Sequence, residues 1–380
     1  MMIYLDNSAT TKPDPSVLAS HQRVSEMFFA NPSSIHQLGG EAERLLTKAR
    51  EQASQILGVE QEEIIFTSGG TEGNNLAIKG IAFEHQNRGK HIITSAIEHP
   101  SVFDTCKSLE KLGFDVTYLP VDQNGVVSAK DLEKAIRDDT ILISIMHVNN
   151  ELGSIQPIAD IGKVVKKHPK LFFHVDNVQG LGKIPLRLKN SGIDLCTFSG
   201  HKIHGIKGTG LLYVKRRTTL FPLFHGGNQE RSIRSGTENL AGAVAMSRAL
   251  RLITESEQMK QTHLESLQQY LRNHLEKMTG LEINTPIDAA PHIMNISVHG
   301  IKPEVMIHTL GAQNIFISTK SACSSKQQDE SRVLLACGYN KARSTTALRI
   351  SMSYSNTIDE LSVFLNALEI AIKQLIKVME

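Results

Sequence analysis

The 380-residue chain has no tryptophan, only four cysteines and almost no excess of charge. No stretch approaches the roughly 18 consecutive apolar residues of a membrane helix, so no membrane-spanning segment is expected. The first residues, MMIYLDNSATT, lack the basic segment and the apolar core of a signal peptide, which predicts a cytoplasmic protein. A net charge of +2 is too small to indicate a nucleic acid or an anionic membrane as a direct partner.

The four cysteines, at positions 106, 196, 323 and 337, include no CxxC pair and form no regular framework. This spacing argues against a structural zinc site, so we expect free thiols and no metal. Cys106, Cys196 and Cys337 lie in helical or strand-like patterns and are interpreted as core thiols. Cys323 differs, because it lies in the polar stretch STKSACSSKQQ (318–328), where chance and function explain its exposure equally well.

Short apolar runs alternate with amphipathic segments between residues 63 and 214. Near-continuous apolar strands that alternate with helices are typical of a mainly parallel α/β sheet covered on both faces. The predicted strands are 64–67, 91–97, 114–120, 140–147, 171–176, 194–200 and 210–214, and the helices predicted between the first five are 75–86, 101–112, 129–136 and 158–168.

The second part of the chain has a different pattern. Residues 216–238 show no periodicity, and a long helical region follows from about 239 to 278, whose middle we expect to join two lobes. The predicted division is a large domain of residues 16–255 and a small α+β domain of residues 1–15 and 256–380. In the small domain, strands are predicted at 292–300 and 345–353, and helices at 302–312 and 357–379.

Three segments carry residues suited to chemistry. TSGGTEGNN (67–75) opens a helix after a strand, so its backbone can bind an anion, although a plain turn explains the glycines equally well. Asp176 ends an apolar strand and is followed by Gln179; an acid there often only caps a turn, but ligands gather beyond the carboxyl ends of parallel strands. Lys202, in SGHKIHG (199–205), follows another buried strand. A lysine is usually a solvated surface charge, whereas a desolvated lysine can form a Schiff base.

The three segments together fit pyridoxal 5'-phosphate. This cofactor needs a lysine for its covalent link, a carboxylate beside its pyridine nitrogen and a nest for its phosphate. The carboxylate keeps the ring nitrogen protonated, so that the ring can accept electrons from a carbanion. The sequence supplies these groups in the order expected along a parallel sheet.

A longer set of motifs gives a family resemblance. The chain resembles the cysteine desulfurases, within the fold-type I, class V aminotransferase-like pyridoxal-phosphate enzymes, which implies a large domain with a mainly parallel sheet and a smaller α+β domain. The matching motifs span Tyr4 to Ser351 and are YLDNSATT, NPSSIH, TSGGTEGNNLAIKG, IEHPSV, MHVNNELG, HVDNVQ, FSGHKIHGIKGTG, RSGTENL, STKSACSS and ALRIS.

The resemblance implies a role for each matched residue. Lys202 would hold the cofactor covalently, and His99 would stack on its ring and assist proton transfer. Asp176 would pair with the ring nitrogen, and Gln179 would bond the ring hydroxyl. Asn150 would lie near the ring and the substrate carboxylate, and Asn31 and Arg349 would bind that carboxylate. The residues that would bind the cofactor phosphate are Gly70, Thr71, Ser199, His201 and, from the neighbouring subunit, Thr237.

The resemblance also explains the exposed cysteine. Cys323 matches the catalytic cysteine of the family. In that family the small domain carries this cysteine on a loop that must move. Cys323 would take the sulfur of L-cysteine as a persulfide, and the rest of the substrate would become L-alanine. A homodimer and a sulfur-acceptor protein are implied, the acceptor being an iron–sulfur scaffold, a tRNA-thiolation enzyme or a thiamine-pathway protein. Lys320 and Gly73 depart from the glycine and the serine usual in these motifs. Lys320 would lower the thiol pKa, or else alter the motion of the loop or the choice of acceptor.

Two alternatives stay open at this point. A selenocysteine lyase, or another class V enzyme such as an aminotransferase, would use the same cofactor without a mobile cysteine. A non-catalytic sulfur-relay protein with a degenerate site would lack the cofactor, although the intact Lys202, Asp176 and Cys323 argue against it.

Overall fold

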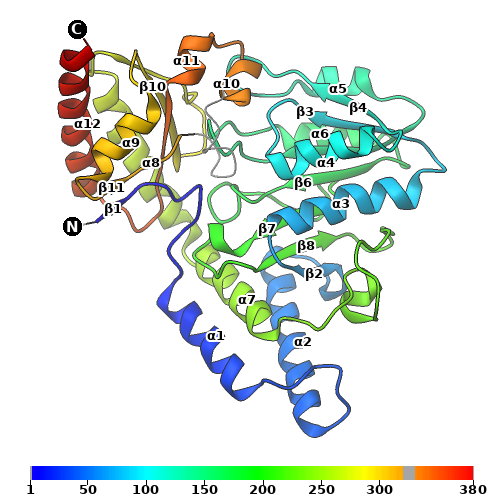
Figure 1. The fold of residues 1–380 in the computed structure, drawn as a ribbon. Helices are drawn as coiled ribbons and strands as arrows, with labels where there is room; N and C mark the ends of the chain where they lie inside the picture. The colour runs from blue at the N-terminus through cyan, green and yellow to red at the C-terminus, as the bar shows by residue number, and fades with distance from the viewer. Residues whose placement is uncertain (1, 320–329, 380) are drawn as a thin grey trace.

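The computed structural model describes residues 2–319 and 330–379, and its centre is a seven-stranded sheet of strand order β2-β8-β7-β6-β5-β3-β4 (Figure 1). β8 runs antiparallel to both of its neighbours, and the other strands run parallel to one another. The strands are β2 (Ile64–Thr67), β3 (His91–Ser95), β4 (Asp115–Leu119), β5 (Thr140–Met146), β6 (Phe172–Asp176), β7 (Leu195–Ser199) and β8 (Gly210–Val214). All seven predicted strands are confirmed.

Helices cover both faces of this sheet. Neighbouring residues of one strand, such as Leu142 and Ile143, belong to different hydrophobic clusters, because successive side chains of a strand point to opposite faces. Both faces are therefore apolar and buried, as the continuous apolar runs predicted. The helices of this part are α3 (Gly70–His85), α4 (Pro100–Glu110), α5 (Ala129–Ala135), α6 (Ile158–Val165) and α7 (Leu240–Thr254).

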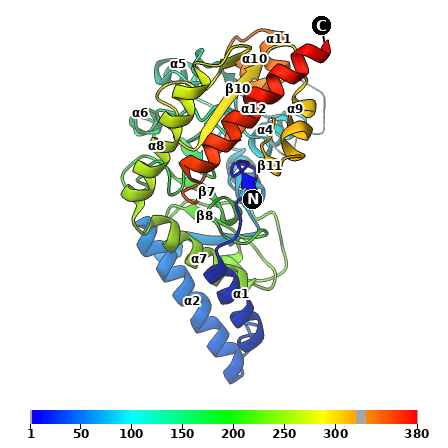
Figure 2. The same cartoon turned by 90° about the vertical axis from the view of Figure 1, so that its left-hand side faces the viewer.

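Two N-terminal helices were not predicted from the sequence. α1 (Pro15–Met27) and α2 (Gln37–Leu57) form a hairpin that packs along α7 and extends away from the body of the molecule (Figure 2). Asp14 caps α1 with its carboxylate, which accepts a hydrogen bond from the Ser16 amide at 2.8 Å. The buried face of α2 is formed mainly by small residues, which allow it to approach α7 closely.

The C-terminal part has a hydrophobic core of its own. The long helical region is broken at Ser256, which has a positive φ of 56°, and continues as α8 (Glu257–Leu275). A three-stranded antiparallel sheet of order β12-β10-β9 packs with α8 and α12, and β1 pairs in parallel with β11. The other elements are β1 (Ile3–Tyr4), β9 (Leu281–Ile283), β10 (Ile293–Val298), α9 (Pro303–Gly311), β11 (Ile315–Phe316), α10 (Arg332–Ala336), α11 (Lys341–Thr345), β12 (Ala347–Ser351) and α12 (Ile358–Met379).

We propose the division of the chain into residues 16–255 and residues 1–15 with 256–380. It is supported by the side chains of Ile3 and Leu5, which pack in the same cluster as residues of α8, β10 and α12, whereas the central sheet packs in other clusters. The N-terminal segment then crosses between the two parts. The Asn7 amide donates to the carbonyl of Ser351 at 3.1 Å, and the Thr11 amide donates to the carbonyl of His201 at 2.8 Å.

The unusual glycine at position 73 is explained by its contact with β7. A Cβ atom on Gly73 would lie 2.7 Å from Cγ2 of Thr197, and the hydroxyl of Thr197 is hydrogen-bonded to the buried ring of His174 at 2.9 Å. Thr197 therefore has little freedom to move aside. A serine at position 73 requires a smaller neighbour at position 197.

We expect Gly73→Ser to destabilise the protein by about 1–3 kcal/mol, because overpacking costs more than the helix gains from losing a glycine. The double variant Gly73→Ser/Thr197→Ser keeps the hydroxyl but removes the clashing methyl, so most of the lost stability should return. Urea unfolding of the apoprotein measures both changes. A single variant as stable as the wild type would show that the contact with Thr197 does not restrict this position.

Candidate active site

A cleft lies beyond the carboxyl ends of β5, β6 and β7, where a parallel sheet commonly binds its ligand. The predicted site residues that line it are Gly70, Thr71, His99, Asn150, Asp176, Gln179, Ser199, His201, Lys202 and Arg349. Asn31 and Thr237 do not line it; both are exposed elsewhere on the chain. Cys323 and Lys320 lie outside the described residues.

Lys202 enters the cleft from the turn that follows β7. Its amine donates hydrogen bonds to the backbone carbonyls of Ser8 and, at 2.8 Å, Ala9. The N-terminal segment therefore holds the tip of this lysine inside the cleft.

Asp176, at the last position of β6, is buried and accepts two hydrogen bonds. The Val178 amide donates to Oδ1 at 3.0 Å, and the side-chain amide of Asn74 donates to Oδ2 at 2.8 Å. Burial raises the pKa of Asp176 above its ordinary value, and these two donors and the charge of Lys202 offset only part of that rise. A buried carboxylate fixed in this way is suited to pair with a cationic ring nitrogen.

The turn from β2 into α3 is shaped to approach an anion. A Cβ atom on Gly70 would lie 2.9 Å from Cγ2 of Val178, so only glycine fits here without displacing its neighbour. The N-terminus of the 16-residue helix α3 adds backbone N–H groups and a favourable dipole. Oγ of Ser199 and Oε1 of Gln179 are buried without a hydrogen-bond partner among the described residues. These groups match the phosphate and the ring hydroxyl of pyridoxal 5'-phosphate, so the site fits this cofactor.

Arg349 supplies a buried positive charge at another side of the cleft. Its side chain is 1% exposed, and its guanidinium donates to the Asn150 carbonyl and to Oδ1 of Asp6, both at 3.0 Å. Nε is buried without a partner in the described part of the chain. A guanidinium fixed at two points, with one N–H still to satisfy, is suited to bind a substrate carboxylate.

His99 is the N-cap of α4, where its Nδ1 accepts a hydrogen bond from the Ser101 amide at 3.1 Å. Burial, together with the positive charge of Lys202, lowers the pKa of His99 to about 4. The ring is therefore neutral at physiological pH and lies in the cleft as an uncharged aromatic surface.

Several residues in and beside the cleft had no role in the sequence interpretation. Ser8, Ala9, Asn74 and Ser101 line it, although each lies in a motif that the sequence analysis singled out. Glu98, beside His99, was also missed. Its Oε1 accepts hydrogen bonds from the Ser95 hydroxyl at 2.6 Å and from the Met146 amide at 3.0 Å, which ties the ends of β3 and β5 together.

Glu98→Gln should reveal the charge state of this buried acid. Burial raises the pKa of Glu98 from 4.5 to about 8, so its contribution to stability is complete below pH 4.5 and is lost as the pH rises through 8. The glutamine cannot ionise. Its stability relative to the wild type should therefore rise by about 1.4 kcal/mol per pH unit across this window. Chemical unfolding of both apoproteins from pH 4.5 to 8 measures the difference between their free energies of unfolding. A difference that does not change with pH would show that the pKa of Glu98 is not raised in the folded protein.

The cysteines that the structure describes are core residues, as predicted. Cys106, Cys196 and Cys337 are buried, and burial raises the pKa of each thiol, for Cys106 and Cys337 to about 12. Within residues 2–319 and 330–379, no group of three or more metal-ligating side chains could hold an ion. No helix in the same ranges is long and apolar enough to cross a membrane.

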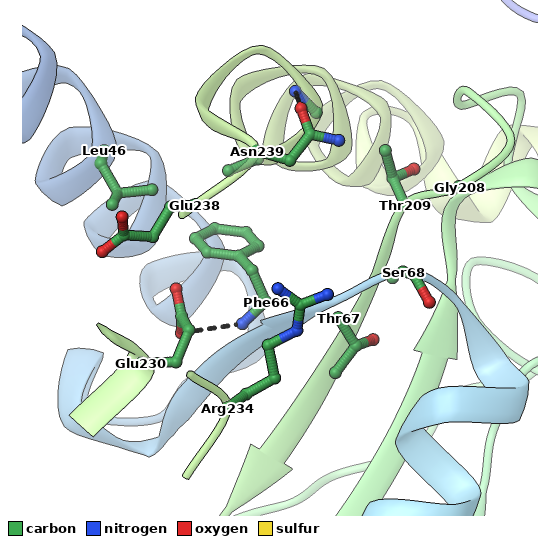
Figure 3. Close-up of a pocket in the computed structure, with 13 residues that line it drawn as sticks. Leu46, Phe66, Thr67, Ser68, Gly208, Thr209, Glu230, Arg234, Glu238 and Asn239 are labelled. Atoms are coloured by element: carbon green, nitrogen blue, oxygen red, sulfur yellow. Dashed lines mark hydrogen bonds between the residues drawn. The ribbon is translucent and has the colours of Figure 1, made fainter. Parts of the chain in front are cut away.

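A second pocket lies beside the cleft, at the edge of the central sheet (Figure 3). Glu230 accepts a hydrogen bond from the Phe66 amide at 3.0 Å and forms an ion pair with Arg50 at 2.8 Å. Glu238 and Asn239, which follow Thr237 in the chain, line this pocket rather than the cleft. Thr237 itself is exposed and lines neither this pocket nor the cleft.

Comparison with known proteins identifies the family. The chain matches the aminotransferase class-V family over residues 3–364 and belongs to it; this family depends on pyridoxal 5'-phosphate, and the predicted fold class and cofactor are confirmed. A protein of Lactobacillus delbrueckii subsp. bulgaricus described as a NifS/IcsS protein homolog is 47% identical over 371 residues, which cover 97% of this chain and 96% of the relative.

Two further comparisons agree with this family. The cysteine desulfurase IscS of Dictyoglomus turgidum is 41% identical over 375 residues, covering 98% of this chain and 95% of that protein. A solved structure described as a NifS-like protein superposes with a TM-score of 0.93 at 38% identity, covering 98% of this chain and 100% of the other. The similarity thus extends over both parts of the fold.

Proposed function

We propose that this protein is a pyridoxal-phosphate-dependent cysteine desulfurase, which converts L-cysteine to L-alanine and passes the sulfur to an acceptor. The observation that carries the proposal is the convergence of Lys202, Asp176 and Arg349 on one cleft, in a chain similar over nearly its full length to proteins named cysteine desulfurase. When bound, the cofactor supplies an electron sink for the α-carbon of the amino acid.

Different residues of the cleft bind different parts of the cofactor. Lys202 bonds it covalently, Asp176 holds a proton on the ring nitrogen, and Gln179 bonds the ring hydroxyl. His99 covers the ring as a neutral imidazole, in accord with its lowered pKa. The phosphate is bound by Gly70, Thr71, Ser199 and His201, with Thr237 reaching it from the partner subunit.

The substrate is held by its carboxylate and loses its α-proton to a nearby amine. Arg349 binds the carboxylate, with Asn150 beside it; the support for Arg349 is its buried guanidinium, whose Nε has no partner among the described residues. Asn31 does not line this cleft, so its role in binding the carboxylate rests on the family motif alone. Lys202 then takes the α-proton, because its amine enters the cleft from the turn after β7. The same amine returns a proton to the product.

Cys323 accepts the sulfur of the substrate. Its thiolate attacks the sulfur of L-cysteine, an S–S bond forms, and the C–S bond breaks with its electron pair on carbon, which takes a proton and leaves as L-alanine. The described residue Ser318 supports this assignment, because its amide and carbonyl pair with those of Arg349 at 3.1 and 2.7 Å. Five residue-to-residue steps separate Cys323 from Ser318 and span at most about 18 Å when extended, which is enough to reach the cleft.

We further propose a cytoplasmic homodimer that delivers persulfide sulfur to an acceptor protein for iron–sulfur clusters, tRNA thiolation or the thiamine pathway. The exposed Thr237 and the apolar side chains at the tip of the α1–α2 hairpin support the dimer, since Met27, Phe29 and Ile35 are 57%, 75% and 107% exposed. The acceptor can be identified by capturing host proteins that bind the persulfidated enzyme and receive its sulfur.

Product analysis tests the reaction against its alternatives. The purified holoprotein is incubated with L-cysteine, with L-selenocysteine, and with L-cysteine plus a 2-oxo acid. Alanine formed from L-cysteine without an amino acceptor supports the desulfurase. Alanine formed from L-selenocysteine but not from L-cysteine would indicate a selenocysteine lyase. A product that forms only when the 2-oxo acid is present would indicate an aminotransferase. A protein that is colourless as purified and inactive with added cofactor would indicate a non-catalytic sulfur relay.

A further inference from the structure

A chain of hydrogen bonds connects Asp176 to His99 beneath the cleft. The Asn74 side-chain nitrogen lies 2.8 Å from Oδ2 of Asp176 and 2.8 Å from Oγ of Ser101. Oγ of Ser101 lies 2.8 Å from Nδ1 of His99. The four side chains come from α3, the end of β6 and the start of α4, so this connection exists only in the folded protein.

The donor and the acceptor of each hydrogen bond in this series can be assigned, starting from Asp176. Both carboxyl oxygens of Asp176 accept, Oδ1 from the Val178 amide and Oδ2 from Asn74, so the Asn74 amide presents its NH₂ group and uses one N–H for the carboxyl and the other for Ser101. The Ser101 hydroxyl then accepts from Asn74 and gives its own proton to Nδ1 of His99. The carbonyl oxygen of Asn74 is buried without a partner among the described residues, so the two N–H groups are what this side chain contributes.

This assignment of donors and acceptors fixes the tautomer of His99. Nδ1 accepts from the Ser101 hydroxyl and from the Ser101 amide at 3.1 Å, so Nδ1 cannot carry a proton. A neutral imidazole must then carry its proton on Nε2, the one ring nitrogen left for a ligand in the cleft. His99 in this state is a hydrogen-bond donor rather than a base, which leaves Lys202 as the group that removes the α-proton.

We propose that Asn74 and Ser101 are positioning residues that hold His99 as the Nε2–H tautomer and link its ring to the carboxyl group of Asp176. The catalytic meaning of this tautomer rests on the proposed function, but the tautomer itself does not. It exists in the protein without cofactor or substrate, so it can be measured separately from activity.

The test is a long-range ¹H–¹⁵N spectrum of the histidine rings in the apoprotein, with the His99 signals assigned by comparison with a His99→Gln sample. In the wild type, Nδ1 of His99 should resonate as an unprotonated nitrogen and Nε2 as a protonated one. Ser101→Ala removes the hydroxyl donor and leaves only the longer contact of the backbone amide at 3.1 Å, so a measurable share of the Nδ1–H tautomer should appear. Ser101→Thr keeps the hydroxyl and should preserve the Nε2–H tautomer. Ser108→Ala, on the same helix α4, is the control and should leave the His99 signals unchanged.

The second arm of the test separates the two residues by the pKa of the Asp176 carboxyl, read from its ¹³C shift. Asn74→Ala removes a donor from the carboxylate and should raise this pKa, whereas Ser101→Ala should leave it unchanged. Lys202, Glu98 and Cys196, the other titratable groups that influence Asp176 or are influenced by it, are present in both variants.

The activity of the holoenzyme supplies a third comparison. Loss of one hydrogen bond that orients His99 should lower kcat of Ser101→Ala about tenfold, with KM for the substrate little changed. A wild-type His99 protonated on Nδ1, or an unchanged tautomer in Ser101→Ala, would overturn the proposal even if the enzyme is a desulfurase. Conversely, an Nε2–H tautomer that responds to Ser101→Ala in a protein that makes no alanine would overturn only the proposed function.

Discussion

Lys202→Ala should abolish the covalent link between protein and cofactor, and with it alanine formation. Lys202 is the lysine that lines the cleft, at the end of β7 and in reach of the groups that bind the ring and the phosphate. Without its amine, no other lysine among residues 2–319 and 330–379 lines the cleft, where it could both bond the cofactor and take the α-proton. Activity should fall by several orders of magnitude, as expected when a barrier rises by several kcal/mol.

The structure offers a matched control in the buried Lys183. The Lys183 amine lies 3.2 Å from the Lys202 carbonyl, and burial lowers its pKa to about 8, so it is chemically a competing amine. It does not line the cleft. Lys183→Met should therefore keep the cofactor bond. Borohydride reduction followed by peptide mass analysis measures the bond in each variant; a bond that survives in Lys202→Ala and is lost in Lys183→Met would reverse the assignment.

Cys323→Ser should stop alanine formation while leaving cofactor binding and α-proton exchange intact. Proton removal depends on Lys202 and the cofactor, whereas breaking the C–S bond needs a thiolate to accept the sulfur. The three cysteines that the structure describes are poor substitutes, because burial raises the pKa of their thiols. Deuterium exchange at the substrate α-carbon and the rate of alanine release separate the two steps.

Cys337→Ser is the matched control for this variant, since Cys337 is the nearest other cysteine in the sequence and is buried. It should make alanine at a rate close to that of the wild type. Wild-type alanine formation and protein-bound sulfur in Cys323→Ser would exclude Cys323 as the sulfur acceptor. Loss of α-proton exchange in the same variant would show that the cysteine also shapes the cleft.

The central sheet could be predicted because each strand is a local signal. An apolar run such as 140–147 is buried on both faces, and its continuity in the sequence follows directly from that burial. The first two helices were missed although signals were present. Asp14 and Pro15 are typical of a helix start, and Leu46, Ala49 and Ala53 repeat at helical spacing. Small apolar residues between charged ones give a weaker pattern than leucine or valine would.

The site could be predicted only in part, for a physical reason. Asp176 ends β6 and Lys202 lies in the turn after β7, and these two strands are parallel neighbours, so the topology alone brings both residues to the same edge of the sheet. The hydrogen bonds of Asn74 with Asp176 and Ser101 join residues far apart in the chain and depend on how α3 and α4 pack. The buried carboxyl group of Glu98 likewise depends on a hydroxyl donor from β3 and an amide donor from β5, and the sequence does not show that the two donors meet at one side chain. Such networks are tertiary and have no local signature.

The most direct test of the proposed function is a single turnover with sulfur-labelled L-cysteine and no reductant. We predict equal amounts of alanine and of labelled sulfur bound to the protein, with the label located by mass analysis on the peptide that contains Cys323. Alanine accompanied only by free sulfide, with no label on that peptide, would contradict the account.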